Sequence, residues 1–229
     1  QATLGIDSTP IYQMLKNNRF YAFREPGFSD WSTEYWVIGE GDHLNDLSSN
    51  QKNRKISLMD ANYGTHMVPL MTVVLNTKGP VLEMGCGDYS TPLLHSLCSV
   101  EKRLLLSTET DLKWMNLYVD LENSWHHFQY VPCYEDDWEV NPKPRLWDHV
   151  GKKMHWGVVF VDHRPGERRI EDVTRLRNQA DVIVVHDTEQ STYRYEPVLS
   201  TFKYRYVYER YATQTTIVSD TIDVSLFFN

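Results

Sequence analysis

Cysteine is scarce in this chain of 229 residues, which contains three of them. Cys86, Cys98 and Cys133 have none of the paired spacings of a zinc site, and an odd number leaves at least one thiol unpaired. A disulfide framework is therefore not expected, because such frameworks use dense cysteines in even numbers. This cysteine usage favours a reducing compartment such as the cytoplasm.

Long hydrophobic runs are also missing. No apolar stretch approaches the roughly 20 residues that cross a bilayer, and the N-terminus lacks a basic segment followed by an apolar one. We therefore expect a soluble protein with no membrane insertion. The chain begins at Gln1 instead of methionine, which is consistent with a domain of a longer polypeptide or with a processed chain.

The chain has no excess of basic residues: 23 Lys and Arg stand against 31 Asp and Glu, for a net charge of −8. A nucleic-acid-binding protein is expected to carry the opposite sign. We therefore predict no nucleic-acid partner, and a protein, a sugar or a small molecule instead. The length allows one or two domains, and an α/β domain of this size can bury a large core.

Two regions differ in pattern. Residues 1–57 are polar and rich in aromatic side chains without a sustained period, and we interpret them as an N-terminal cap or lid. Residues 58–229 form the predicted main domain. It opens with a helix-like segment at 60–76, in which Thr65 can cap the helix.

Within the main domain, short apolar runs alternate with helical segments, which is typical of an α/β fold with a mostly parallel sheet and helices on both faces. The predicted strands are 80–84, 103–108, 127–132, 156–162 and 181–186, and the predicted helices are 90–98, 111–123 and 168–179. Residues 204–211 and 213–219 then alternate around a short gap, which predicts a C-terminal antiparallel hairpin.

A glycine turn follows the first of these strands. Glu83 lies inside the apolar run, and Gly85 and Gly87 permit positive φ and close backbone approach. Ser90 or Thr91 can cap the next helix. Such a turn presents backbone N–H groups to a ligand, so we interpret it as a nucleotide-cofactor loop. The third glycine of a dinucleotide fingerprint would fall at Ser90, which argues against NAD.

Acidic residues follow the next two strands. Glu109 ends the second strand, where a carboxylate can accept hydrogen bonds from both ribose hydroxyls of an adenosine cofactor. The alternative is a helix-capping or solvated glutamate. After the third strand, residues 133–138 carry acidic and aromatic side chains that can meet an adenine base, although such a cluster is usually an ordinary loop.

The ordered set, completed by Asp162 after the fourth strand and by the closing hairpin, resembles class I S-adenosylmethionine-dependent methyltransferases over roughly residues 60–220. The resemblance implies a Rossmann-like seven-stranded sheet whose last strand is inserted antiparallel. It also implies S-adenosylmethionine lying across the carboxyl ends of the first three strands. Ligands in open α/β sheets do bind at that edge.

The resemblance also assigns cofactor contacts. Gly85 and Gly87 would face the methionine part of the cofactor, and Glu109 the ribose, with Glu83, Ser90 and Thr91 in the same loop. Asp136 would lie near adenine, with Glu135 nearly as good a choice. Tyr63 precedes the first strand, where related enzymes often place a residue against the cofactor. The alternative for Tyr63 is an ordinary packing role.

Two further strands end in His/Asp pairs, Asp162-His163 and His186-Asp187, and a parallel sheet brings both pairs to one edge. That edge is where a methyl group would be transferred to a hydroxyl. A histidine, or a carboxylate whose pKa burial raises, suits the general-base role. We predict His163 or Asp162 as the base. Asp187 or His186 would orient the acceptor or hold a metal.

The same residues can alternatively bind a divalent metal ion. Asp162, Asp187 and Glu189 offer hard oxygen ligands, to which the histidines would add nitrogen. Several O-methyltransferases use such a site to bind adjacent hydroxyls. The alternative is that His186-Asp187 only satisfies buried polar groups at a strand end.

Substrate contacts are expected from the loops beyond these strands. Arg164 can recognise an acidic or polar acceptor, whereas Arg168 and Arg169 can simply form a solvated helix start. Tyr193 and Tyr195 can pack against the C–H faces of a sugar, although core packing is the default for such rings.

The segments around residues 161–169 and 180–188 also resemble loops of polysaccharide O-methyltransferases such as the plant glucuronoxylan enzymes. In both, an Asp, a Pro-Gly turn and an Arg follow strand four, and a His-Asp pair follows strand five. The resemblance covers some 35 residues and favours a carbohydrate acceptor. A domain of a larger multidomain glycan-synthesis protein would fit this reading and the missing methionine.

Three functions follow for testing. The leading one is an S-adenosylmethionine-dependent O-methyltransferase that acts on a hydroxyl of a sugar or glycan. The second is a metal-dependent O-methyltransferase of a catechol-like small metabolite. The third is a non-catalytic binding domain that retains the fold.

Overall fold

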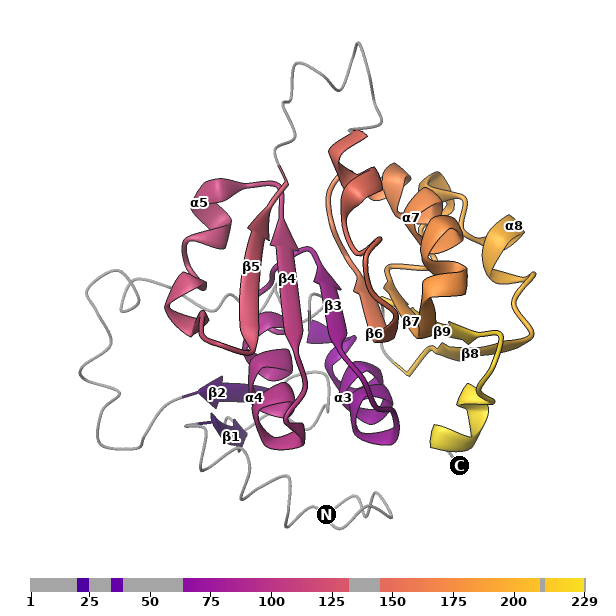
Figure 1. Ribbon diagram of the computed structural model, residues 1–229. Coiled ribbons are helices and arrows are strands. Elements are labelled where there is room, and N and C mark those ends of the chain that lie inside the picture. The colour runs from indigo at the N-terminus through magenta and orange to yellow at the C-terminus, as the bar shows by residue number, and fades with distance from the viewer. Residues whose placement is uncertain (1–19, 25–33, 39–63, 132–144, 211–212, 229) are drawn as a thin grey trace. The chain divides into compact units, whose positions relative to one another are not determined.

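The computed structural model describes residues 64–131, 145–210 and 213–228, together with the backbone of strands at 20–24 and 34–38 (Figure 1). The chain divides into two compact units, residues Gln1–Asn62 and Tyr63–Asn229. In the first unit, β1 (Phe20–Arg24) pairs antiparallel with β2 (Glu34–Ile38). The role of this unit as a cap or lid stays a prediction.

The second unit is built on a seven-stranded sheet with the order β5-β4-β3-β6-β7-β9-β8. Neighbours from β5 to β7 are parallel, and β9 is antiparallel to both β7 and β8. The predicted α/β class and the C-terminal antiparallel hairpin are confirmed. The strands are β3 (Val81–Met84), β4 (Leu105–Glu109), β5 (His126–Tyr130), β6 (Trp156–Val161), β7 (Ala180–His186), β8 (Tyr204–Tyr208) and β9 (Thr215–Ser219).

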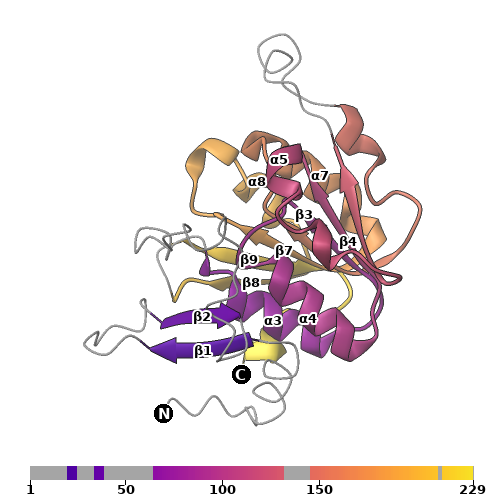
Figure 2. The same ribbon diagram turned by 90° about the vertical axis from the view of Figure 1, so that its left-hand side faces the viewer.

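Helices cover both faces of this sheet, with α3 and α4 on one side and α7 and α8 on the other (Figure 2). The α-helices of the second unit are α3 (Met67–Asn76), α4 (Thr91–Glu101), α5 (Leu112–Met115), α7 (Arg169–Leu176) and α8 (Glu196–Leu199). Short 3-10 helices complete the described chain: η4 (Val119–Leu121), η5 (Arg145–His149), η6 (Gly166–Arg168), η7 (Arg177–Gln179), η8 (Ser191–Tyr193) and η9 (Val224–Phe228).

The core follows from the two-residue period of the strands. Along β6, Val159 and Val161 pack in one cluster with Val173 and Leu176 of α7. The side chain of Phe160, which lies between the two valines, is on the other face, and its ring centroid is 4.8 Å from that of His66. All six residues of β6 are buried, as expected for a central parallel strand covered on both faces.

Helix starts differ from the predictions. His66, not Thr65, stands at the N-cap of α3, and Ser90 stands at the N-cap of α4 without a side-chain cap hydrogen bond. The predicted helix at 111–123 is broken into α5 and η4, and Asp111 caps α5 by accepting from the backbone N–H groups of the next turn. None of the helices in the described part of the chain has the length and apolarity that a membrane crossing requires.

Candidate functional site

The glycine turn after β3 packs directly on the end of β6. Gly85 has φ +97°, a conformation that residues with a side chain rarely adopt. A Cβ atom at this position would lie 2.7 Å from the Asp162 carbonyl oxygen and 2.8 Å from His163 Cα. Glycine is therefore required both by the backbone angle and by the contact between the two strand ends.

The first three N–H groups of this turn are bound inside the protein. They donate to Thr108 O (from Gly85, 2.9 Å), Glu109 Oε2 (from Cys86, 3.0 Å) and Thr91 Oγ1 (from Gly87, 2.9 Å). The expectation that the turn presents its N–H groups to a ligand is wrong for these three. A Cβ atom at Gly87 would approach Ser90 Oγ at 3.2 Å and no other described atom within 4 Å, so this face of the turn has room for a ligand.

Glu83 supports the turn from inside the sheet. Its carboxylate is fully buried, and it accepts hydrogen bonds from the Thr91 hydroxyl at 2.9 Å and from the Ser107 hydroxyl at 2.5 Å. Burial raises the pKa of Glu83 to about 7, against the lowering effect of these hydroxyls. Glu83 and Thr91 thus hold the turn in place, and Thr91 binds Glu83 instead of capping α4.

Glu109, the last residue of β4, bridges to the glycine turn. Its Oε2 accepts from Cys86 N, and its Oε1 accepts from the N–H groups of Thr110 at 2.6 Å and Asp111 at 2.9 Å. With 7% of its surface exposed it is not a solvated glutamate, and the cap of α5 is Asp111. The predicted ribose-binding carboxylate is therefore anchored beside the turn at the carboxyl edge of the sheet.

Two aromatic residues that the sequence did not single out also hold the turn. The indole Nε1 of Trp114 donates to Cys86 O at 2.7 Å, and the hydroxyl of Tyr118 donates to Asp88 Oδ1 at 2.7 Å. Their ring centroids are 5.9 Å apart, edge to face. Both lie in the segment predicted as a plain helix, where no motif marks them.

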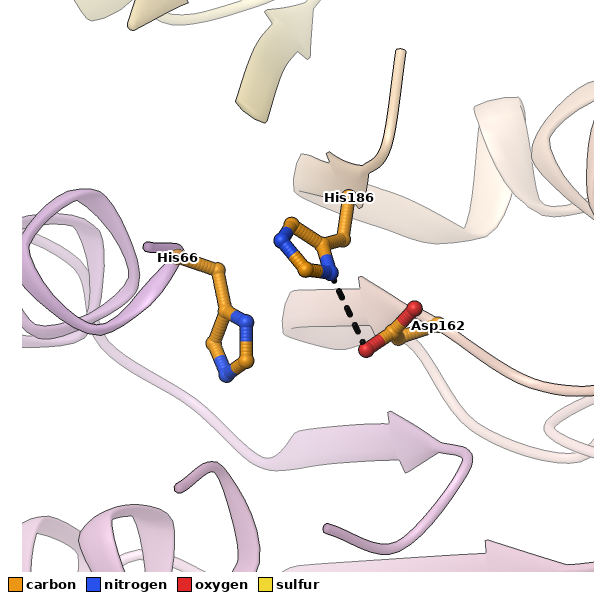
Figure 3. Close-up of side chains that lie close together, drawn as sticks. All are labelled: His66, Asp162 and His186. Atoms are coloured by element: carbon orange, nitrogen blue, oxygen red, sulfur yellow. Dashed lines mark hydrogen bonds and ion pairs between the residues drawn. The ribbon is translucent and has the colours of Figure 1, made fainter. Parts of the chain in front are cut away.

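Asp162 and His186 meet at the carboxyl ends of β6 and β7, which are parallel neighbours. His186 Nδ1 lies 3.2 Å from Asp162 Oδ2 (Figure 3), and His186 Nε2 lies 3.0 Å from Thr65 Oγ1. Arg169 binds the other carboxylate oxygen, Asp162 Oδ1, at 2.9 Å.

The charges of this group support one another. Burial opposes ionisation, but the neighbouring Arg169 and His186 outweigh it and hold the pKa of Asp162 well below its usual range. Burial likewise lowers the pKa of His186, and Asp162 overcomes this and raises it. The pair therefore forms a charge-assisted hydrogen bond at neutral pH.

His66 is a member of this group that sequence reasoning missed. It is 3% exposed, and its ring centroid lies 4.5 Å from that of His186, edge to face. Neither ring nitrogen has a hydrogen-bond partner among the described residues. Burial lowers the pKa of His66 to about 3, so the ring is neutral. No spacing in the sequence connects position 66 with the strand ends that it faces.

Asp162 and Asp187, the predicted metal pair, both lie beside His186, and their role as metal ligands stays a prediction. Asp187, with φ +58°, lies 3.4 Å from Arg169 Nη1 and 3.6 Å from His186 Nδ1, beside the group. In the described chain, the donor atoms that gather within 4.8 Å of one another belong to His66, Asp162 and His186 (Figure 3). Glu189 accepts from the Gln214 backbone N–H and is not among them.

His163 does not reach this site, so its assignment as general base is corrected. The ring is 1% exposed, stacks on Trp147 with a centroid distance of 4.1 Å, and places Nε2 3.2 Å from Asp172 Oδ2 of α7. Because side chains alternate along a strand direction, His163 enters the core on the α7 side of the sheet, one residue after Asp162.

The arginines after β6 are not a solvated helix start. Arg168 is buried in ion pairs with Asp172 and Asp148. Arg169 is buried too: Nε donates to His163 O at 2.7 Å, and the guanidinium lies over the Tyr193 ring at 5.4 Å.

The two predicted substrate contacts, Arg164 and Tyr193, lie in the loops that follow β6 and β7. Arg164 is exposed, and Tyr193 is half-buried. The Tyr193 ring packs so closely on Gly166 that a Cβ atom there would lie 2.4 Å from it. Tyr63 and Asp136, with the neighbouring acidic cluster of residues 133–138, lie outside the described residues, and their roles stay predictions.

No protein-family model matches the chain, and no curated protein matches it. Among solved structures, it is similar to the METTL16 methyltransferase domain, with a TM-score of 0.48 and 12% identity over 68% of this chain and 82% of that one. Human methyltransferase-like protein 13 in complex with SAH has a TM-score of 0.48 and 10% identity, over 73% of this chain and 90% of that one. The bifunctional kinase-methyltransferase WbdD has a TM-score of 0.46 and 12% identity, over 70% of this chain and 40% of that one. Identities and TM-scores at this level carry no argument about function, which is argued below from the site.

Proposed function

We propose that the protein is an S-adenosylmethionine-dependent O-methyltransferase that acts on a hydroxyl of a sugar or glycan. The observation that carries the proposal is the contact between the two cofactor elements predicted from the sequence. The Glu109 carboxylate accepts from the backbone N–H of Cys86 in the glycine turn, at the sheet edge where Asp162 meets His186. Open α/β sheets bind their ligands at this edge.

The residues present fit the cofactor. Glu109 Oε2 accepts one hydrogen bond at 3.0 Å, and a carboxylate oxygen can accept a second, here from a ribose hydroxyl. Gly87 leaves space beside the turn for the methionine part, and Ser90 and Thr91 shape the turn from below. When bound, S-adenosylmethionine supplies a methyl group on a positively charged sulfur. Tyr63 and Asp136 would complete the cofactor site.

The acceptor would lie against Asp162, His186 and Asp187. Its hydroxyl oxygen forms a bond to the methyl carbon, the carbon–sulfur bond breaks with its electron pair passing to sulfur, and the hydroxyl proton passes to the Asp187 carboxylate, whose pKa burial raises. Alignment of the oxygen with the methyl carbon can supply several kcal/mol, on the order of 7 or more. The group is held rigidly for this purpose, because Arg169 and the ends of β6 and β7 fix it.

A carbohydrate acceptor is proposed from the loop resemblance and from two side chains at this edge. Arg164 is exposed and can bind a carboxylate or hydroxyl, and the exposed part of the half-buried Tyr193 ring can contact sugar C–H groups. We propose that the chain acts within a larger multidomain glycan-synthesis protein. The cluster of His66, Asp162 and His186 favours a second candidate, a metal-dependent enzyme for catechol-like small metabolites.

Cofactor binding is tested by calorimetry. The protein should bind S-adenosylmethionine, and Glu109→Ala should weaken binding at least about 10-fold, which corresponds to about 1.4 kcal/mol for a lost charge-assisted hydrogen bond. Glu101→Ala, a glutamate paired with Lys78 on the far end of α4, is the matched control and should bind like the wild type. No measurable binding to the wild type would refute both enzyme functions and leave the non-catalytic domain.

The acceptor is tested with labelled cofactor and a panel of oligosaccharides and catechols. We expect label in the oligosaccharides. Label in the catechols alone would replace the leading proposal with the second candidate.

A further inference from the structure

The starting point is the unsatisfied histidine beside the predicted acceptor site. His66 is buried, and both of its ring nitrogens are without a hydrogen-bond partner among the described residues. Buried polar atoms are almost always paired, because leaving one unpaired costs its full desolvation free energy. A leucine would pack against Phe160 without that cost. His66 therefore offers two ring nitrogens to a partner outside the described residues.

We propose that His66, Asp162 and His186 form a binding site for a divalent transition-metal ion. One donor atom from each residue lies within 4.8 Å of the others, and Figure 3 shows His66 facing the Asp162–His186 pair. Metal bonds to imidazole and carboxylate are about 2.0–2.2 Å long, so two ligand atoms of a tetrahedral ion lie about 3.4 Å apart. Side-chain rotations would bring the three donor atoms from their present spacing to this distance.

The surrounding residues hold two of the three proposed ligands, His186 and Asp162, as metal sites require. Ligating histidines usually make a hydrogen bond through their second ring nitrogen, and ligating carboxylates are themselves hydrogen-bonded. His186 Nε2 lies 3.0 Å from the Thr65 hydroxyl, so the ion would take the place of the proton that Nδ1 shares with Asp162 Oδ2. Arg169 binds Asp162 Oδ1 at 2.9 Å, which leaves Oδ2, the oxygen 3.2 Å from His186 Nδ1.

The donor set selects the kind of metal. Two imidazoles and one carboxylate suit Zn²⁺, Fe²⁺, Co²⁺, Mn²⁺ or Ni²⁺, whereas Mg²⁺ and Ca²⁺ prefer oxygen alone. Three protein ligands also leave open positions on the ion. Resting on the proposed function, we assign these positions to two neighbouring oxygen atoms of the acceptor, which the ion would hold beside the methyl donor.

Metal binding is tested on the untagged full chain after chelator treatment and dialysis. Calorimetry with Zn²⁺ alone, and visible absorption with Co²⁺ alone, should each show one ion per chain. His66→Leu should bind more than about 100-fold more weakly, since loss of a ligand exceeds the 10–100-fold effect of losing a supporting residue. His155→Leu is the matched control, because His155 is an exposed histidine elsewhere that pairs with Asp181, and it should bind like the wild type.

A second variant and a parallel measurement separate the outcomes. Asp162→Asn keeps the side-chain shape and should also weaken binding, with circular dichroism confirming that each variant is folded. No ion bound by the wild type, or equal binding by His66→Leu, would overturn the metal site. S-adenosylmethionine binding is measured on the same samples. Cofactor binding without metal binding would remove this inference alone, and metal binding without cofactor binding would remove the proposed function alone.

Discussion

Glu83 makes the stability of this fold depend on pH in a direction unusual for a carboxylate. The side chain is fully buried under the glycine turn, and burial raises its pKa from the ordinary 4.5 to about 7. Between these values the folded chain holds a proton that the unfolded chain has lost. The contribution of Glu83 to the free energy of unfolding is therefore complete below pH 4.5 and is lost as the pH rises through 7. The difference between these two pKa values corresponds to about 3 kcal/mol.

Glu83→Gln isolates this effect. Its amide is neutral at every pH, its carbonyl can accept from the Thr91 hydroxyl, and its NH₂ group can donate to Ser107 Oγ. Ser107 can then donate to His126 Nε2 at 2.9 Å, since burial lowers the pKa of His126 to about 3 and the neutral ring can carry its one proton on Nδ1. The variant thus imitates protonated Glu83 and should lack its pH dependence.

Urea unfolding of both proteins from pH 5 to pH 9 measures the difference directly, because contributions of all other groups cancel on subtraction. The unfolding free energy of the wild type minus that of Glu83→Gln should fall by about 2 to 3 kcal/mol across this range. Two parallel curves would refute the reasoning, and a difference that rises with pH would show that the folded protein stabilises the ionised form.

Three further changes test the site by unfolding measurements. Gly85→Ala should lower the free energy of unfolding by about 3 kcal/mol or more, because φ is +97° and the new Cβ would overlap backbone at 2.7 Å. Gly87→Ala should lower it far less. Equal losses of stability in the two variants would contradict the packing described for the turn. Arg169→Met should destabilise by about 3 kcal/mol or more by leaving Asp162 without its guanidinium, and a neutral result would show that the ion pair is not formed. In chelator-treated protein, His66→Leu should raise the unfolding free energy by about 1 kcal/mol because it removes unsatisfied nitrogens, and a loss of stability would mean that His66 has a partner within the fold.

The sequence by itself determined which residues reach the functional edge. The carboxyl ends of parallel strands lie at one edge of a sheet. That these residues stand at or just after apolar runs was therefore enough to predict that they gather at this edge: Gly85, Glu109, Asp162 and His186. The alternation of strands and helices and the closing hairpin were equally readable, because burial on one or both faces leaves a period in the sequence.

Only the tertiary structure decided which way each side chain faces and what it meets. Asp162 and His163 are neighbours in sequence, yet one faces His186 and the other enters the core against Trp147, because successive residues point to opposite faces of the sheet. His66 joins the site from a helix start almost a hundred residues away in the chain. No local pattern encodes such a contact, since it arises from the packing of α3 against the sheet and not from the residues around position 66.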